Sequence, residues 1–461
     1  MTANTIQQAG EYTVDEMTIL TSSGVVYDLR QMVQYIEIFE DVNRPVMTGN
    51  IVIMDIDNMI ENAPIIGQEF MSLKIRTPSF AKEDGIIDFS DNVFSIFKIM
   101  SKDDASMNAQ IYTLSFCSPE LLRSNRTKVS KSYTGSIDEI VEKVLRDERF
   151  INTRKKLIFE KTSGIRKIIS PNLRPFAFID QLKEEAMSEK YGSPHFLFYE
   201  NAEGIHFRSM QSIFESGSIG EYNTGDIEVE SNPQQSVETV LQRVLQFQVN
   251  SNNDMLLNTR GGMLGSTMTT HNLYTKQVSS KTFDYFKDFG KYPRINENPI
   301  YNDTEIDQFD NTIGSFPNAR TFVHSVSSSG GQDRQYDTPL NDYLYATTGV
   351  PEALQHRRSK VLELEFGVNV SMKLTGNTSI SIGKMMDITV PVTGRVHEKE
   401  DNEFLSGKYM ITKVRHMFSQ ADKKHEILVN ACKDSLPKKY PTNADSREPF
   451  GDKSASVQIS Y

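Results

Sequence analysis

The sequence predicts an α+β protein that is mostly β, in which two β-rich regions flank a small helical region. Runs that alternate strictly between apolar and polar residues, typical of half-buried strands, occur on both sides of that region. Between them, apolar residues recur at the spacing of an amphipathic helix instead. A chain of 461 residues rarely folds around one core, so we expect about two to four domains.

The first β-rich region covers residues 12–118. Its strand candidates are the runs at residues 51–56, 70–75, 93–99 and 110–117. Polar residues separate these runs, and Pro78 ends the second of them. Short strands at fairly regular spacing with polar turns predict a small barrel or sandwich.

Residues 119–230 are predicted to form a small α+β domain of two helices followed by a β-hairpin. Ser136 and Glu139 have the spacing of a capping box at the start of the first helix. The apolar face of that helix comprises Ile137, Ile140, Val141, Val144 and Leu145. Pro175 suits the first turn of the second helix, and the hairpin is expected to turn at Gly204.

The second β-rich region is predicted from residues 231–278 and 356–436. Strict alternation indicates strands at residues 245–250 and 368–374. The β pattern resumes at residue 361, and apolar runs continue to the end of the region. We therefore expect one β domain that is split by an insertion.

The insertion itself covers residues 279–355. It is polar and rich in Asn, Asp, Ser and Tyr, so we expect mostly irregular structure there. The polar C-terminal tail, residues 437–461, is expected to dock on a partner or to stay mobile.

Charge and hydropathy exclude several classes of protein. The net charge of −11 argues against a protein that holds nucleic acid by neutralising its phosphates. It is compatible with a wall past which nucleic acid slides, because acidic groups repel phosphate. The mean hydropathy is −0.44, and no run of about 18 apolar residues exists, so we expect no membrane span. The first residues lack the pattern of a signal peptide.

The two cysteines, Cys117 and Cys432, lie far apart in the sequence. A disulfide framework is therefore not expected, and folding in a reducing compartment fits best. We expect each thiol to be a small buried apolar group.

No combination of residues indicates a catalytic centre, a cofactor site or a metal site. The eight histidines lack the spacing of a metal motif. Residues 260–265, Arg-Gly-Gly-Met-Leu-Gly, lack the ending of a phosphate-binding loop, so a tight turn with positive φ explains these glycines better. Glu184 and Glu185 are adjacent on a predicted helix and do not point at one bond, as a glycosidase pair would.

Several segments occur in the order typical of one family. They are residues 116–122, 133–145, 172–186 and 196–207, followed by residues 383–392 and 406–418. Their succession of helix, helix and aromatic hairpin resembles the tail hub family. That family includes the baseplate central hubs of contractile-tailed, T-even-like phages and the related N-terminal part of type VI secretion spike proteins.

The resemblance implies two tube-like β-barrel domains on either side of the helix–helix–hairpin domain. A homotrimer would present 3 × 2 = 6 similar domains in a ring. Such a hub is structural rather than enzymatic. It joins a trimeric tail spike to the sixfold tail tube and leaves a channel for the passage of DNA. No cofactor is implied.

The resemblance also implies the partners and the place of the protein. The partners are the tail spike protein, the tail tube or tube-initiator protein and the surrounding baseplate wedge proteins. Neither sequence-specific nucleic acid binding nor stable membrane association is expected. The protein would be assembled in the host cytoplasm and reside in the tail baseplate of the virion.

Ring closure requires contacts between copies, and obligate interfaces typically bury more than ~2,000 Å². We expect the edge strands of the tube-like domains to make these contacts. The candidate strands are residues 245–250, 368–374 and 409–418. The candidate interface residues are Leu245, Phe247, Val249, Val368, Val370, Met372, Tyr409 and Ile411.

Other functions remain alternatives. A tube initiator or an injection-system hub outside phage would belong to the same class. A tail-tip peptidoglycan hydrolase lacks a catalytic pair in the sequence, and a zymogram would test it. A carbohydrate-binding protein for host attachment needs an aromatic platform, which the absence of Trp disfavours; a glycan array would test it.

Overall fold

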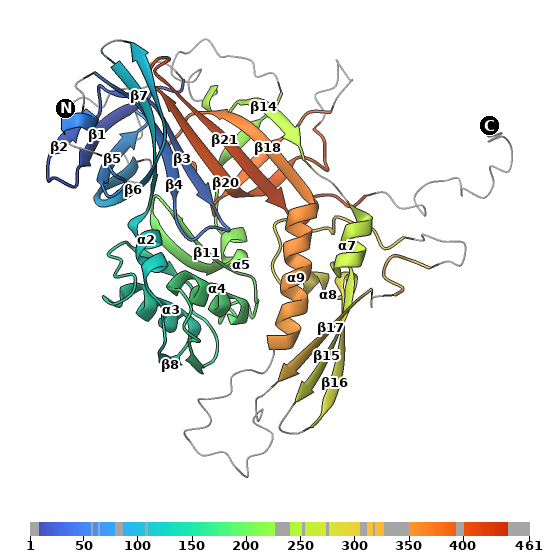
Figure 1. The fold of residues 1–461 in the computed structure, drawn as a ribbon. Coiled ribbons are helices and arrows are strands. Elements are labelled where there is room, and N and C mark those ends of the chain that lie inside the picture. Colours follow the sequence, from blue (N-terminus) through green and yellow to red (C-terminus); the bar gives the residue numbers. More distant parts are fainter. Residues whose placement is uncertain are drawn as a thin grey trace, which may run out of the picture.

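A computed structural model describes most of the chain (Figure 1). The described residues are 9–56, 59–62, 65–78, 86–106, 109–225, 240–250, 254–272, 276–304, 311–316, 319–326, 350–392 and 401–440. A large β-sheet crosses the upper part of the view, a helical region lies below its left part, and a smaller sheet extends downward on the right. The mostly β, α+β architecture expected from the sequence is confirmed.

The first β-rich region forms strands at all four predicted runs, and three further strands, β1, β2 and β3, were not predicted. Its elements are β1 (Thr13–Leu20), β2 (Val26–Asp28), β3 (Val33–Asp41), β4 (Thr48–Asp55), α1 (Met59–Asn62), β5 (Phe70–Arg76), β6 (Ile86–Ser106) and β7 (Ala109–Cys117). Every second residue of β4 is buried, as the pleat of a half-buried strand requires. The buried side chains form one core, which includes Ile36, Ile51, Leu73 and Phe116.

The second β-rich region provides five further strands of the large sheet, and β13 (Ser218–Asn223) joins them from within residues 119–230, the range predicted as the α+β domain. The five strands are β14 (Val244–Val249), β18 (Val368–Thr375), β19 (Met385–Thr389), β20 (Gly407–Ser419) and β21 (Lys424–Lys433). In β18 and β21 apolar residues again alternate between the core and the other face. The core of this region includes Val370, Met372, Ile411 and Val429.

The two β-rich regions share one sheet. β20 pairs antiparallel with β3, from Lys413 opposite Asp41 to Ser419 opposite Tyr35. This joint links both sets of strands into a continuous 13-stranded sheet. The division of each β-rich region into a tube-like barrel remains a prediction.

The strands of the two regions follow the same order in this sheet. In the first region the order is β3-β4-β7-β6-β5-β1, and in the second it is β14-β18-β21-β20-β19-β13. The path of the chain through the two sets is also the same. The first strand takes the last place and the next two take the first two places; the remaining three then fill the places between them, beginning beside the first strand. One pairing differs, since β1 and β5 are antiparallel and β13 and β19 are parallel.

The helical region lies between these two sets in the sequence. Its elements are α2 (Pro119–Arg126), β8 (Ser132–Gly135), α3 (Ile137–Arg146), β9 (Leu157–Phe159), β10 (Arg166–Ile169), α4 (Pro175–Glu185), β11 (Phe196–Asn201), β12 (Gly204–Ser209) and α5 (Met210–Phe214). The five predicted apolar residues of α3 are all buried. Ser136 does cap α3, but its side chain makes no capping hydrogen bond, so the predicted capping box is not formed.

The hairpin of this region turns at Gly204, as predicted. Gly204 has φ +144°, and a Cβ atom there would lie 2.3 Å from the carbonyl oxygen of Lys156. Only glycine fits this approach of the turn to the neighbouring chain.

The insertion is more ordered than the sequence suggested. The connection between β14 and β18 holds α7 (Met255–Gly261), β15 (Gly265–Asn272), β16 (Val278–Asp284), α8 (Tyr285–Asp288), the 3₁₀-helix η2 (Phe289–Lys291), β17 (Arg320–Val326) and α9 (Val350–Phe366). β16, β15 and β17 form a separate three-stranded sheet, which Figure 1 shows projecting from the body. The expected irregular structure at 279–355 is therefore wrong for the described part of that range.

Two physical reasons explain the difference. β16 is exposed over most of its length and is built from Ser, Thr and Lys, so it carries no apolar alternation to reveal a strand. The expected strand pattern from residue 361 is instead the second half of α9, which ends just before Gly367. Gly262 has φ +86° and caps α7, which confirms the turn with positive φ predicted for the glycines at 260–265.

Parts of the predicted insertion and most of the predicted tail, from residue 441 onward, lie outside the described residues. The described start of the tail contacts the body. The side-chain amide of Asn298 donates to the carbonyl of Pro437 at 3.0 Å, and the ring of Tyr440 stacks on Phe404.

Candidate assembly surfaces

One face of the large sheet is polar where the opposite face packs on the two cores. Because successive side chains point to opposite faces, every second residue of the paired strands lies on this polar face. It crosses the joint between the two sets. Its members include Glu37, Asn50, Ser115, Ser371, Lys413, Arg415 and Asn430.

Charges on the polar face are balanced by close pairs. Arg415 is ion-paired with Glu37 across the joint, and its guanidinium lies 5.5 Å from the ring centre of Phe39. Lys413 lies 3.4 Å from Asp41 on the same two strands. Lys373 lies 2.8 Å from Glu426 on β21. These basic groups are therefore neutralised within the chain, and the face has no unpaired basic stripe along β18 and β20.

The polar face is hollowed along the joint. A hollow of about 620 Å³ is lined by residues of β3, β4, β7, β20 and β21, among them Phe39, Asn50 and Leu428. A second hollow of about 470 Å³ continues toward α9, and Lys413 and Asn430 line both. The hollows open along strands that carry hydrogen-bonding side chains, such as those of Asn50, Ser115 and Asn430.

The described strands leave two long edges of this sheet without a partner. β14 is the last strand at one end, and it pairs only with β18. β6 is long: its first half pairs with β5, the N–H of Ile96 still bonds the carbonyl of Glu69 at 2.9 Å, and beyond that point β6 pairs with β7 alone. Both edges carry exposed apolar side chains next to unpaired backbone groups, a combination typical of a contact surface.

The eight predicted interface residues fall into two groups. Leu245 and Val249 on β14 are each 41% exposed, and Phe247 between them is partly buried. The other five residues are buried in the core of the same chain; they are Val368, Val370, Met372, Tyr409 and Ile411. β18 and β20 also have strand partners on both sides. These five side chains are therefore unavailable for contacts between copies, and the role of β14 remains a prediction.

β6, which has the second open edge, was not among the predicted interface strands. Phe97 is 44% exposed, Ile99 36% and Met100 54%. The apolar run at 93–99 predicted a strand, but it could not reveal that this half of the strand lacks a neighbour. The open edge depends on pairing with β5, which ends near Ser95.

A buried ionic cluster fastens the helical region to the first β-rich region. Lys155 lies between two buried carboxylates: its Nζ atom is 2.9 Å from Glu120 and also bonds Glu200. Burial opposes the charge on Lys155, but the two carboxylates outweigh it and raise the lysine pKa. The other oxygen of Glu200 accepts the backbone N–H of Met47, between β3 and β4, at 3.0 Å.

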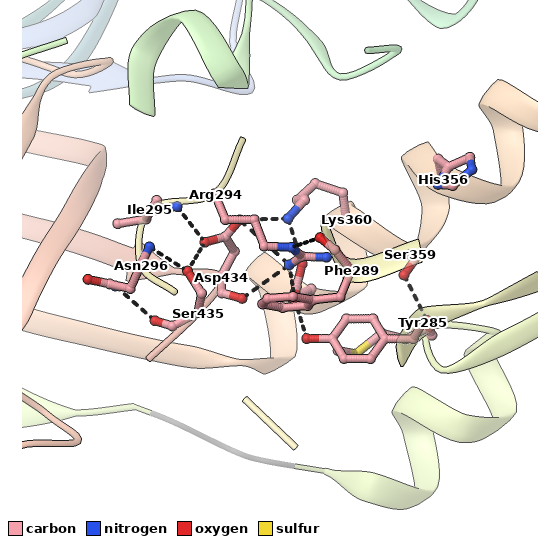
Figure 2. A network of polar contacts seen from close by, with 12 residues as sticks. Tyr285, Phe289, Arg294, Ile295, Asn296, His356, Ser359, Lys360, Asp434 and Ser435 are labelled. Atoms are coloured by element: carbon pink, nitrogen blue, oxygen red, sulfur yellow. Dashed lines mark hydrogen bonds and ion pairs between the residues drawn. The ribbon is translucent and has the colours of Figure 1, made fainter. Parts of the chain in front are cut away.

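A second buried cluster fastens the inserted region to the second β-rich region (Figure 2). Lys360 of α9 lies 2.7 Å from Glu363 and 2.6 Å from Asp434. Arg294 donates to Glu363 at 2.7 Å and lies over the ring of Phe289. Burial would raise the pKa of Asp434, but Lys360 and Arg294 outweigh it and lower that pKa. The network thus joins three segments that are distant in sequence.

Glu40 of β3 links the first β-rich region to the loop before β19. One of its oxygens accepts the Ser381 hydroxyl at 2.6 Å and the backbone N–H of Ile382 at 3.0 Å. The other oxygen has no hydrogen-bond partner among the described residues. Burial raises the pKa of Glu40 to about 7.

The histidines of β20 and β21 belong to the core. Nδ1 of His416 lies 3.1 Å from Nε2 of His425, and the ring of His425 stacks on Phe418. Burial lowers the pKa of His416 to about 4. Across the described residues, no group of three or more His, Cys, Asp or Glu side chains is arranged to hold a metal ion. No helix in this part of the chain is long and apolar enough to span a membrane.

Comparisons with known proteins identify the fold. No family model and no curated protein matches the sequence. The tail protein from Neisseria meningitidis MC58 is similar in structure, with a TM-score of 0.52 at 10% identity, over 94% of this chain and 100% of that one. The 43 kDa tail protein of prophage MuSo2 from Shewanella oneidensis has a TM-score of 0.49 at 9% identity, over 91% and 99% of the two chains.

A third solved structure is the E. coli c3393 protein, described as a component of the type VI secretion system. Its TM-score is 0.43 at 12% identity, over 93% of this chain and 78% of that one. The likeness to the Neisseria tail protein shows a shared fold. It confirms, at the level of the fold, the resemblance to tail proteins that the ordered sequence motifs indicated.

Proposed function

We propose that this chain is the central hub subunit of a phage tail baseplate, and that it works as a ring-shaped homotrimer. Its role is structural: it joins a trimeric tail spike to a sixfold tail tube. The fold shared with a tail protein supports the class of protein. The arrangement of strands supports the symmetry.

The observation that carries the proposal is the repeated strand order. One chain contributes two sets of strands with the same order, and the β20–β3 joint holds them side by side in one sheet. Three chains therefore supply 3 × 2 = 6 similar sets. A ring of six similar sets matches a sixfold tube on one face, while the three helical and inserted regions keep threefold symmetry for a spike.

The polar face of the sheet is suited to line the central channel. Passing DNA meets Asn, Ser and Gln side chains and cations that acids already neutralise, as Glu37 and Asp41 do at the joint. Because the cations at the joint are already paired with carboxylates, they release few counterions on meeting phosphates, so the DNA is not held there and slides past. This refines the expectation of an acidic wall: the charge near the joint is balanced.

Light scattering on the purified full-length chain tests the proposal. We expect a mass of about 157 kDa, since 3 × 52.4 kDa corresponds to a trimer, and negative-stain images of rings with a central hole. A monomer of about 52.4 kDa at micromolar concentration, which also fails to bind tube and spike proteins of the same virion, would rule the hub function out.

A further inference from the structure

We propose that the ring closes by antiparallel pairing of β6 of one copy with β14 of the next, in the register that β20 and β3 have within the chain. The inference rests on the proposed ring and names the strands and residues that close it. The β20–β3 joint serves as the template, because β6 and β14 are the strands that take the corresponding places in the other set.

The pairing registers show that β6 corresponds to β20. β20 has a bulge against β21 between Ile411 and Lys413, and β6 has a bulge against β7 between Ile96 and Lys98. β6 also has a second bulge, between Ile99 and Ser101, which β20 lacks, so residues beyond it are matched by the β7 residue that they face. One residue before each bulge, β20 faces Cys432 and β6 faces Cys117. The two cysteines thus occupy the same position in the two sets.

The register of the next strands agrees with this correspondence. On the polar face, the Ser371 hydroxyl donates to Oδ1 of Asn430 at 2.9 Å, and the Ser115 hydroxyl donates to Oδ1 of Asn50 at 2.9 Å. The same Ser–Asn hydrogen bond therefore joins β18 to β21 in one set and β4 to β7 in the other. The serine is on β18 in the first case and on β7 in the second.

β14 corresponds to β3 by the same criterion. β14 has a bulge against β18 between Val244 and Gln246, and β3 has one against β4 between Val33 and Tyr35. Counting from these bulges, residues 247–249 of β14 match residues 36–38 of β3. Phe247 therefore corresponds to Ile36, and Val249 corresponds to Ile38. Between them, Gln248 corresponds to Glu37. Asn250, whose N–H bonds the carbonyl of Asn369, takes the place of Phe39.

The template predicts which residues meet between copies. Arg415 lies opposite Phe39 within the chain, and their counterparts are Ser101 and Asn250. Met417 lies opposite Glu37, and their counterparts are Asp103 and Gln248. We therefore expect Ser101 of one copy opposite Asn250 of the next, and Asp103 opposite Gln248.

Burial favours this joint. At the internal joint Ile38 is fully buried and Val414 nearly so, whereas their counterparts Val249 and Ile99 are 41% and 36% exposed in the single chain. Pairing the two edges covers both residues and satisfies two rows of open backbone groups. The contact is heterologous, so repetition generates a ring rather than a simple twofold dimer.

Cysteine cross-linking tests the register. In the double variant Ser101→Cys/Asn250→Cys, mild oxidation should give dimer and trimer bands on a non-reducing gel, because opposed Cα atoms lie within disulfide range. A link inside one chain is excluded, since β6 and β14 lie on opposite edges of the sheet. The control Ser101→Cys/Gln246→Cys is four residues out of register, about 13 Å, and should stay unlinked.

A charge substitution tests the contact independently. Val249→Lys should lower the mass from trimer to monomer, while Val323→Lys, at a more exposed valine on β17, should leave the trimer intact. Suppose that the wild type forms trimers, but the Ser101→Cys/Asn250→Cys pair does not cross-link or Val249→Lys still forms trimers. The proposed pairing of β6 with β14 would then be wrong, and the hub function would be unaffected. A wild-type monomer would overturn both.

Discussion

Buried charged residues hold the regions of this chain together, because two buried lysines are each ion-paired with two buried carboxylates. Lys155 stands between Glu120 and Glu200, and Lys360 stands between Glu363 and Asp434. Each cluster includes a group from another region of the chain. Breaking such a cluster by removing one member is costly, because it leaves an uncompensated buried charge.

Glu40 gives a prediction for pH dependence. Its pKa is raised from 4.5 to about 7 in the folded chain, so the folded state binds a proton more tightly than the unfolded state between these values. The stability that Glu40 contributes is complete below pH 4.5 and is lost as pH rises to 7. We expect Glu40→Gln to remove this slope and to stabilise the chain at pH 8 by about 2–3 kcal/mol.

Urea unfolding between pH 4.5 and 8 measures this effect. The control is Glu139→Gln, at an exposed carboxylate of α3, which should follow the wild-type curve. An unchanged slope in Glu40→Gln would show that Glu40 does not titrate in this window.

Among the elements, α9 was not predicted from the sequence, yet it connects the inserted region to the large sheet. The helix lies between β18 and the small β15–β17 sheet, and it carries Lys360 and Glu363 of the buried network (Figures 1 and 2). Arg294, just after η2, completes the network from the opposite side. The inserted region is therefore attached to the body through polar contacts as well as through packing.

Arg294→Met tests this attachment. The variant leaves Glu363 and Asp434 with Lys360 as their only basic partner in the network, so we expect a loss of about 3–5 kcal/mol in unfolding free energy. Hydrogen exchange should rise in β16 and η2 but not in β4. Arg358→Met on the exposed side of α9 is the control, and equal effects of both variants would contradict the assignment.

For the molecule as a whole, the continuous sheet means that neither β-rich region is complete without the other. Phe418 of β20 belongs by sequence to the second region, yet its side chain is fully buried in the core of the first. Val42, at the end of β3, lies conversely in the core of the second. We therefore expect the two regions to unfold together.

Phe418→Ala is the corresponding prediction. The cavity should cost about 3–5 kcal/mol and should reduce hydrogen-exchange protection in β1 and β3 as well as in β20. Phe316→Ala, at a phenylalanine that is 67% exposed, should change neither. Loss of protection confined to β20 and β21 would show that the two regions are independent.

Local patterns were sufficient for the elements whose signal repeats within a few residues. Alternation identified β14 and β18, strand-like apolar runs identified β4 and most of β20, and the 3.6-residue period identified α3 with its buried face. The glycine at 204 could be predicted because a tight turn imposes its requirement locally. The ordered motifs also indicated the tail-protein fold that the structural comparison confirms.

The partners of the strands could not be predicted in the same way. A strand has the same alternation whether its neighbour is adjacent in sequence or hundreds of residues away, as β3 and β20 are. Which edges stay open, why Val370 is buried while Val249 is exposed, and which basic groups are neutralised all depend on that pairing. Periodicity is a property of one segment, whereas burial and hydrogen bonding require a second segment that the long-range fold supplies.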